Sequence, residues 1–332
     1  SRMEAARKRE EEENRRNQMA ERKEQNEAMQ QVEEDLGHVK KPAKVVTVFS
    51  AKGGVGKTTI ACELATFLSL TNHGKGKFRV CLVDYDLMFG DILSTLNFNP
   101  NQANMMDWIA DLDKKHKAGQ EWNAISYDAG QIERFLQKKE ESGLYSLIAP
   151  ITNFDYMKIS NEEIVNLCGT MLRNIVENGD FDFVIVDTGN NIEDATYVSL
   201  ERADEILLIL TQSMNSANCN NNFLNTMNHL EFDLSKIRIV INKAKPAKGV
   251  GISVNELQEA LKNPVTNQPF ECYAKIKDND AVQNAENIGE PMVYKSSHEF
   301  TKSIGEVAHH VIGDTFVLAK PKKKRFSFFR KK

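Results

Sequence analysis

The stretch Ser50-Ala-Lys-Gly-Gly-Val-Gly-Lys-Thr-Thr59 decides the fold of this chain. The β-branched apolar run Val45–Ser50 leads into it, and an amphipathic pattern that predicts a helix over Thr58–Leu70 follows it. A strand, a glycine-rich turn and a helix in this order are the context of a phosphate-binding loop, or P-loop. Glycines let successive backbone N–H groups face one anion, and the helix N-terminus adds its dipole. We therefore predict that this loop binds ATP.

The side chains of the loop suit the parts of a magnesium-bound nucleotide. Lys57 can reach the β- and γ-phosphates, the Thr58 hydroxyl can ligate Mg²⁺, and Thr59 can help to hold the α-phosphate. The turn itself supplies backbone N–H groups from Gly53, Gly54, Val55 and Gly56. ATP and Mg²⁺ are thus the cofactors that the sequence predicts.

Acidic residues follow two further apolar runs. Arg79–Asp84 continues into Tyr85-Asp86, and Phe183–Asp187 ends in an aspartate. A single aspartate after a strand is often a turn residue or a helix cap. Two such ends in a chain that carries a P-loop favour a functional role, because ATP hydrolysis needs acids that organise Mg²⁺ and water.

Apolar runs alternate with helical patterns across residues 42–314. The expected strands are Val45–Ser50, Arg79–Asp84, Leu144–Ala149, Phe183–Asp187, Glu205–Thr211, Lys236–Ile241 and a weaker one near Glu271–Ile276. The expected helices include Thr58–Leu70, Asn161–Val176, Asn215–Leu230, Val254–Leu261 and Phe300–Ile312. Short buried strands separated by helices predict an α/β fold of the P-loop NTPase class, with a doubly wound, mostly parallel sheet flanked by helices.

Two polar segments flank this predicted ATPase domain. Residues 1–40 are rich in Glu, Arg, Lys, Gln and Asn, which favours a charged helix or linker, or less readily a coiled coil. Residues 315–332 form a tail, and 320–332 hold eight Lys or Arg and no acid, although the net charge of the chain is −4. The five cysteines show no CxxC spacing, which favours free thiols in a reducing cytoplasm.

The loop departs from the pattern GxxxxGK[ST], because Ala51 stands where its first glycine belongs and Lys52 comes next. Lys52-Gly-Gly-Val-Gly-Lys-Thr-Thr59 resembles the deviant P-loop of the MinD/ParA superfamily of ATPases. The resemblance implies that Lys52 crosses a dimer interface to the partner's nucleotide and that hydrolysis is slow and depends on dimerisation. Lys52, Lys57 and Asp86 are then the catalytic residues.

The same resemblance implies roles for the acids and for one amide. Asp84 lies near Mg²⁺, Asp86 positions the attacking water, and Asp187 reaches the metal through a water. Asn242, after the strand Ile237–Ile241, contacts the adenine. The stretch Lys275-Ile-Lys-Asp-Asn-Asp280 resembles the base-binding segment of the family, with Lys277 in place of its proline.

Softer stretches resemble the CpaE/TadZ branch, ATPases that place pilus-assembly and secretion machinery at a cell pole. They are Asp84–Asp91, Gly143–Pro150, Phe181–Thr188 and Ala281–Pro291. The branch implies an ATP-dependent homodimer that positions a membrane-associated machine. A ParA-like DNA-partition ATPase and a MinD-like cell-division ATPase are the alternatives, beside a scaffold that binds ATP without turnover.

The tail suggests where such an ATPase acts. Residues 320–332 interleave cations with Phe326, Phe328 and Phe329, a composition that favours an anionic membrane surface. Nucleic acid or a protein partner, such as a pilus, secretion or polar protein, would also suit it. We expect a cytoplasmic protein, associated peripherally with the inner face of the cell membrane and placed at a pole.

Overall fold

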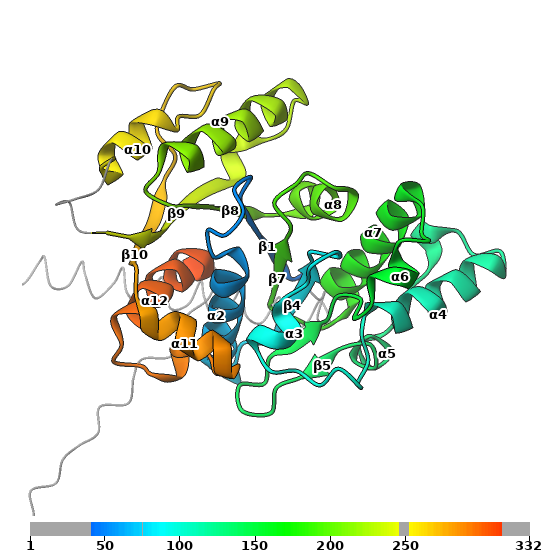
Figure 1. The fold of residues 1–332 in the computed structure, drawn as a ribbon. Helices are drawn as coiled ribbons and strands as arrows, with labels where there is room; N and C mark the ends of the chain where they lie inside the picture. Colours follow the sequence, from blue (N-terminus) through cyan, green and yellow to red (C-terminus); the bar gives the residue numbers. More distant parts are fainter. Residues whose placement is uncertain (1–40, 75, 246–251, 314–332) are drawn as a thin grey trace, which may run out of the picture. The chain divides into compact units, whose positions relative to one another are not determined.

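The computed structural model describes residues 41–74, 76–245 and 252–313. The segments predicted as a charged helix (1–40) and as a basic tail (320–332) lie outside the described residues, so the predicted domain boundaries stay predictions. An eight-stranded sheet forms the centre, in the order β10-β9-β8-β1-β7-β4-β6-β5 (Figure 1). Every neighbouring pair is parallel except β5, which runs antiparallel to β6.

The strands are short and mostly buried. The sheet consists of β1 (Lys44–Phe49), β4 (Val80–Tyr85), β5 (Gln137–Lys138), β6 (Tyr145–Leu147), β7 (Phe183–Thr188), β8 (Glu205–Leu210), β9 (Ile237–Ala244) and β10 (Cys272–Lys277). A separate hairpin joins β2 (Asn72–His73) to β3 (Gly76–Lys77). All seven predicted strands are present within a few residues, and the predicted doubly wound, mostly parallel sheet is confirmed.

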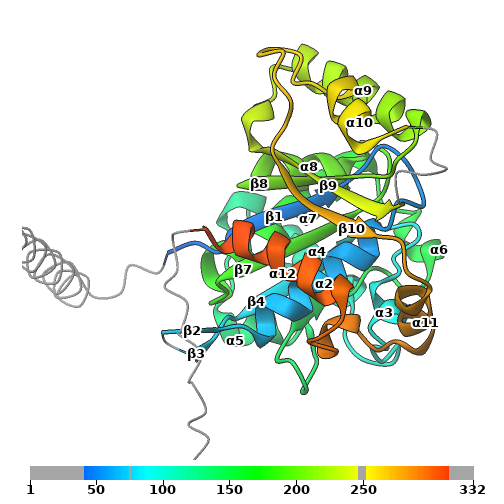
Figure 2. The ribbon, with the colours of Figure 1, turned by 90° about the vertical axis from the view of Figure 1, so that its left-hand side faces the viewer.

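Helices cover both faces of the sheet. One layer holds α2 (Lys57–Leu70), α3 (Ile92–Thr95), α11 (Asp280–Ile288) and α12 (Glu299–Ile312). The other holds α4 (Met105–Lys117), α5 (Ala129–Glu133), α7 (Asn161–Asn178), α8 (Asp194–Arg202), α9 (Met214–His229) and α10 (Val254–Ala260). Figure 2 shows α12 beside α2, with which it packs. The short helix α6 (Asn153–Tyr156) follows β6.

Alternation along β1 explains why both layers exist. Val46 and Val48 belong to the core under α2 and α12, whereas Val45 and Phe49 point to the opposite helices. A strand that is apolar on both faces has to be covered on both faces, since its side chains point alternately up and down. No helix among the described residues is long and apolar enough to span a lipid bilayer.

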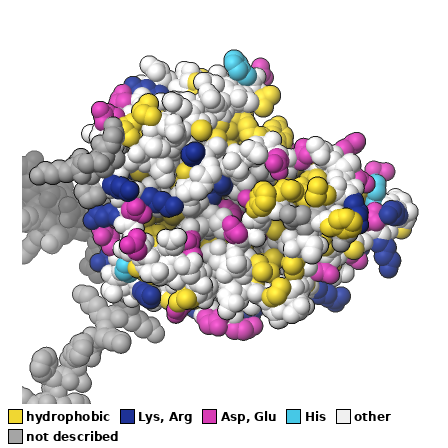
Figure 3. All heavy atoms as spheres, viewed as in Figure 1, with side chains coloured by type: hydrophobic (Ala, Val, Ile, Leu, Met, Phe, Trp, Pro, Cys, Tyr) yellow, Lys and Arg dark blue, Asp and Glu magenta, His cyan; other side chains and the backbone are white. Residues whose placement is uncertain are grey.

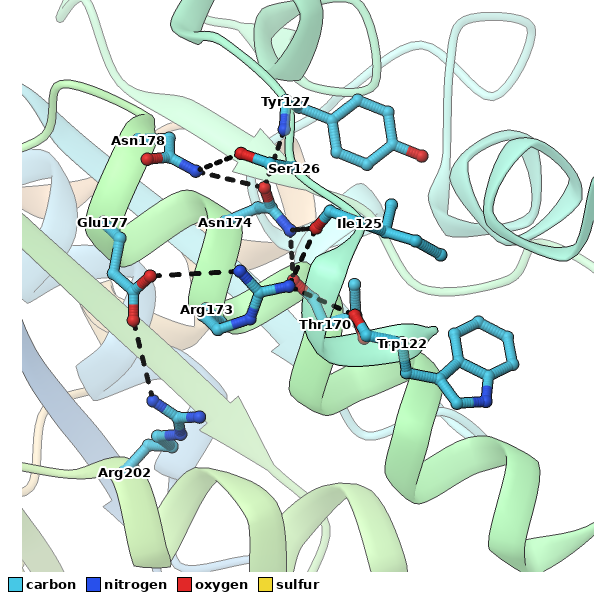
Figure 4. A network of polar contacts seen from close by, with 10 residues as sticks. All are labelled: Trp122, Ile125, Ser126, Tyr127, Thr170, Arg173, Asn174, Glu177, Asn178 and Arg202. Atoms are coloured by element: carbon cyan, nitrogen blue, oxygen red, sulfur yellow. Dashed lines mark hydrogen bonds and ion pairs between the residues drawn. The ribbon is translucent and has the colours of Figure 1, made fainter. Parts of the chain in front are cut away.

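A polar network fastens the second layer beside α7 (Figure 4). The fully buried Asn174 side chain accepts a hydrogen bond from Tyr127 N (2.9 Å) and donates to the carbonyls of Ile125 (3.1 Å) and Thr170 (2.9 Å). Arg173 donates to the Ile125 carbonyl as well, at 2.8 Å. We call these contacts the Asn174 network; they tie the segment before α5 to α7.

Candidate nucleotide site

The P-loop joins β1 to α2 at the carboxyl edge of the sheet. Gly54 and Gly56 have φ values of 74° and 91°, which side chains rarely tolerate. A Cβ added at Gly56 would lie 2.4 Å from Asn242 Nδ2, so the loop also needs glycine for close packing. Asn242 Nδ2 in turn donates to the Val55 carbonyl at 2.8 Å. Because β9 continues to Ala244, Asn242 lies inside that strand rather than after it.

Asn220 on α9 holds the start of the loop. Its Oδ1 accepts a hydrogen bond from Ala51 N at 3.1 Å, and its Nδ2 donates to the Ser216 carbonyl at 2.8 Å. The side chain is fully buried. A buried amide that satisfies the loop's backbone fixes the turn before any ligand binds.

Asp84 and Asp187 lie opposite each other on the neighbouring strands β4 and β7. Both side chains are fully buried, and neither carboxylate oxygen of Asp187 has a hydrogen-bond partner among the described residues. Burial raises the pKa of Asp187, whereas the nearby Thr58 hydroxyl and Lys57 ammonium lower it. Burial also raises the pKa of Asp84, and the charges of Asp187 and Asp86 raise it further.

Asp86 lies one step further out, next to the same two acids. Its backbone N–H donates to Asp84 Oδ1 at 3.3 Å, and its Oδ1 accepts from Phe89 N at 3.2 Å. A Cβ added at Gly90 would meet Asp84 Oδ2 at 2.6 Å, so this loop passes close over the buried carboxylate. We refer to Asp84, Asp86 and Asp187 as the acid cluster.

The acid cluster suits a divalent cation that is shared with a nucleotide. In the part of the chain that the structure describes, no three Asp, Glu, His or Cys side chains converge to hold a metal alone. Mg²⁺ in nucleotide sites uses one or two carboxylates together with phosphate oxygens and water. Asp187 offers two oxygens without partners, and Asp84 and the Thr58 hydroxyl complete an all-oxygen set. These residues fit the predicted metal.

The two lysines of the loop differ in their surroundings. Burial lowers the pKa of Lys57, while the charges of Asp187 and Asp86 act in the opposite direction. The half-buried Lys52 makes no side-chain hydrogen bond or ion pair to any described residue. Lys57 therefore feels the charge of the acid cluster, whereas the ammonium of Lys52 is left available.

A pocket of about 170 Å³ lies on the other side of the P-loop. Its walls come from the loop, β9, the end of β10 and α11; the polar lining residues include Thr59, Asn242, Lys243, Lys277, Asp278, Asn279, Asp280, Gln283 and Glu286. Asn242 and the Lys275–Asp280 segment, which the sequence assigned to the base, thus meet in one place. The Thr59 hydroxyl, predicted to face a phosphate, here donates to Glu286 Oε1.

Comparison with known proteins agrees with this geometry. The AAA_31 family model, described as an AAA domain, matches residues 43–239. The septum site-determining protein MinD of Thermotoga maritima is 22% identical over 276 residues, which cover 81% of this chain and 88% of the relative. This chain belongs to the MinD/ParA superfamily of P-loop ATPases.

Solved structures of superfamily members share the fold. A ParA family ATPase from Chlorobium tepidum has a TM-score of 0.64 at 23% identity, with 80% of this chain and 99% of that chain covered. MinD from Pyrococcus horikoshii, solved with Mg-ADP, has a TM-score of 0.61 at 15% identity, with 81% and 96% covered. At this level of identity the likeness establishes the architecture alone.

Sequence reasoning missed several residues of this MinD/ParA site. Asn220 and Glu286 lie in helices whose patterns show nothing unusual, and their contacts with the P-loop depend on tertiary packing. Lys243, whose Nζ donates to the Gly54 carbonyl at 3.1 Å, directly follows Asn242 but carries no signal of its own. Only Glu286 could have been suspected from its position, because it lies on α11 less than two helical turns after the predicted base-binding segment.

Proposed function

We propose that this chain is a Mg-ATP-dependent, dimer-forming ATPase that positions or regulates a membrane-associated machine. The observation that carries the proposal is the buried Asp187 carboxylate, which lacks a hydrogen-bond partner among the described residues while it lies beside Lys57 and Thr58. A buried carboxylate whose oxygens accept no hydrogen bond costs free energy even beside a lysine, which favours a bound cation as the missing partner.

Each residue of the site then has a role in phosphoryl transfer to water. Lys57 and the P-loop N–H groups bind the phosphates, and Thr58, Asp84 and Asp187 would hold Mg²⁺, which neutralises charge on the phosphate oxygens. Asp86 is more accessible than Asp84 and lies at the mouth of the cluster, where it can orient a water for in-line attack. Asn242 and Glu286 shape the side that receives the nucleoside.

The environment of Lys52 supports the dimer. Its ammonium is available, and Phe89, whose N–H donates to Asp86, is 72% exposed. Phe154 in α6 and Met157 just after it are 72% and 70% exposed. Figure 3 shows hydrophobic side chains gathered on this face of the molecule. A second copy that covered this face would bring its own Lys52 toward the γ-phosphate, where charge develops during transfer.

Molecular mass in solution tests the dimer. With ATP and Mg²⁺, we expect Asp86→Ala to run at twice the mass that it has with ADP, because slowed hydrolysis traps the ATP state. Lys52→Ala should bind ATP but stay at the single-chain mass with either nucleotide. Asp113→Ala, which changes a partly exposed acid on α4 that pairs with Lys117, is the control. A wild-type and Asp86→Ala mass that is the same with ATP and ADP would contradict the proposal.

The membrane role and the CpaE/TadZ-like placement of pilus or secretion machinery rest on the tail and on the softer sequence resemblance. Sedimentation with phosphatidylglycerol vesicles should show ATP-dependent binding that is lost when residues 321–332 are removed. Equal sedimentation with and without the tail would remove this half of the proposal. Salt-sensitive, ATP-dependent binding to arbitrary duplex DNA would instead favour the ParA-like DNA-partition ATPase. Cell-division defects on deletion would favour the MinD-like cell-division ATPase.

A further inference from the structure

A second cleft lies between the far end of the P-loop helix α2 and the end of α11. Its volume is about 570 Å³, within the range of about 300–1,000 Å³ in which proteins bind ligands. The turn after α3 and the segment between β5 and β6 close its other sides. Figure 1 shows α2, α11 and β5 together in the lower half of the molecule. The acid cluster contributes nothing to this cleft.

The cleft combines apolar walls with an acidic rim. Leu70, Leu96 and Pro291 line it, and Ile288 and Tyr294 lie at its mouth with 64% and 38% of their surface exposed. The exposed acids Glu141 and Glu290 line the rim. Such a lining suits an occupant that carries both apolar groups and positive charge.

Two further side chains of the cleft sharpen this chemistry. Lys139 is its only lysine or arginine among the described lining residues, and its ammonium donates to the Asn97 carbonyl at 2.8 Å and lies 4.9 Å from the centre of the Phe98 ring. The ammonium is thus anchored within the fold, and its only charged neighbour of note in the described part of the chain is the rim acid Glu141, so Glu290 is the acid that no lysine of the cleft offsets. The buried Thr66 hydroxyl has no hydrogen-bond partner among the described residues, so it remains a donor or acceptor for a polar occupant.

The described chain ends on the same side of the molecule as this cleft. Helices α2 and α12 pack together, and both start at the carboxyl edge: α2 leaves the P-loop, and Glu299 at the start of α12 pairs with Lys277 at 2.5 Å. Both helices therefore end at the amino edge, where Lys44 Nζ donates to the Val311 carbonyl at 2.7 Å. Packed helices are about 8–10 Å apart, so residue 313 leaves at the same edge of the sheet at which α2 ends.

We propose that the cleft binds the chain's own segment 320–332, with a phenylalanine between its apolar walls and basic residues against Glu141 and Glu290. The segment alternates eight cations with three phenylalanines, which matches the lining in both respects. From residue 314 to Phe326 the chain can span about 40 Å at about 3.3 Å per residue, enough to reach the cleft. Tyr294 offers an aromatic face to an arginine.

This docking goes beyond the proposed ATPase and would connect the tail to it. The cleft and the nucleotide pocket share α2 and α11: Val282, Gln283 and Glu286 face the nucleotide side, and Ile288 and Glu290 face the cleft. A docked tail would also be withheld from any other surface that it binds. Release of the tail and a change in the nucleotide pocket would then involve the same two helices.

Photo-crosslinking of the full chain without nucleotide tests the inference directly. With p-benzoylphenylalanine in place of Phe328, ultraviolet light should give an intramolecular product whose adducts fall on residues 139–141 or 288–294. Adducts confined to other regions, or none above background, would contradict the proposal. A product of twice the chain mass as the main species would show that a second copy is the occupant, which would also overturn it.

Charge reversal at the rim provides the matched test. The double variant Glu141→Lys, Glu290→Lys should lose at least fivefold in crosslink yield, and trypsin should cut its tail at least fivefold faster than that of wild type. The control Glu201→Lys, Glu259→Lys changes two exposed acids on α8 and α10, on the opposite face, and should leave both readouts unchanged. The milder double variant Glu141→Gln, Glu290→Gln should lose less crosslink yield than the charge-reversed protein, and it provides the test if the charge-reversed protein misfolds. Equal yields in all variants would refute the docking whatever the outcome of the ATPase experiments.

Discussion

The Asn174 network and the acid cluster are both buried and polar, but they differ in whether their polar atoms have hydrogen-bond partners. Asn174 uses its oxygen and its amide group within the chain, on Tyr127, Ile125 and Thr170. Asp187 is equally buried, and both of its oxygens lack a partner among the described residues. The first arrangement stabilises the fold as it stands, whereas the second leaves bonding capacity for something that is not protein.

This difference separates residues that hold the fold from residues that serve a ligand. A satisfied buried network contributes to stability, and removing one member leaves its partners unpaired. An unsatisfied buried carboxylate reduces stability until a cation arrives. Mutations in the two regions should therefore have opposite signatures in stability and activity.

The largest effect is expected at Asp187. Asp187→Asn should slow ATP hydrolysis about 1,000-fold, or about 4 kcal/mol, because the metal loses an anionic partner. The nucleotide-free protein should be at least as stable as wild type, since a buried charge is removed. Phosphate release and thermal unfolding without nucleotide measure the two effects. A variant destabilised by more than about 1 kcal/mol would place Asp187 with the structural residues.

Asn174→Ala should show the reverse signature. It leaves the Tyr127 N–H without its acceptor and removes one of the two donors to the Ile125 carbonyl, which keeps its bond from Arg173. The free energy of unfolding should therefore fall by about 3 kcal/mol, while the Kd for ATP stays the same. Urea unfolding and nucleotide titration provide the readouts. Asn166→Ala, which changes a partly exposed residue on the same helix, should change neither quantity. A change in ATP affinity at Asn174 would break the separation between the two regions.

Glu63 on α2 lies between the two extremes and gives a pH dependence. Its carboxylate accepts hydrogen bonds from Met292 N (2.7 Å) and Val293 N (2.9 Å), yet burial raises its pKa from 4.5 to about 7. The folded protein thus holds a proton that the unfolded chain releases, so stability is full below pH 4.5 and is lost as the pH rises through 7. Between pH 5 and pH 7, the free energy of unfolding of wild type should fall by about 2 kcal/mol more than that of Glu63→Gln.

Urea unfolding at the two pH values measures this loss. Glu201→Gln, which changes an exposed acid, should show the same change in the free energy of unfolding between the two pH values as wild type. If Glu63→Gln also showed the wild-type change, another buried acid would have to cause the pH dependence.

The smallest effect is expected at Asn242, which is buried and satisfied but touches the P-loop. Loss of its bond to the Val55 carbonyl in Asn242→Ala should weaken ATP binding about tenfold, or about 1.4 kcal/mol. Asn221→Ala removes a similar bond, from Nδ2 to the Ala260 carbonyl, away from the site and should leave affinity unchanged. Isothermal titration separates the two variants, and equal affinities would mean that Asn242 has no part in nucleotide binding.

Much of the fold was predictable because the strands are continuous apolar runs. The buried runs of β1, β4 and β7 are hard to mistake, whereas the two-residue strand β5 and the helix α11, with only Ala285 buried, carry almost no periodic signal. The order of the strands in the sheet could not be predicted from the sequence, because β1 lies between β7 and β8, which are more than 130 residues away along the chain. Long-range pairing of this kind is decided by tertiary packing.

The site was predictable where chemistry follows directly on a strand. The P-loop, Asp84, Asp86 and Asp187 all fall at strand ends that the sequence located, and the structure brings them to one edge. Asn220 and Glu286 reach the same loop from helices that follow β8 and β10, so their role depends on how α9 and α11 pack. The end of β9 was placed three residues early, because Asn242 and Lys243 are polar residues that continue the ladder beside β10.

The contact between Lys44 and the Val311 carbonyl joins the first strand of the sheet to its last helix. The described chain therefore enters and leaves the domain at one corner, opposite the edge that carries the P-loop. A tether fixed there leaves the nucleotide edge free to rotate toward a second molecule. Fusing a rigid fluorescent protein at either end should therefore disturb turnover far less than an insertion of equal size in the loop after β4.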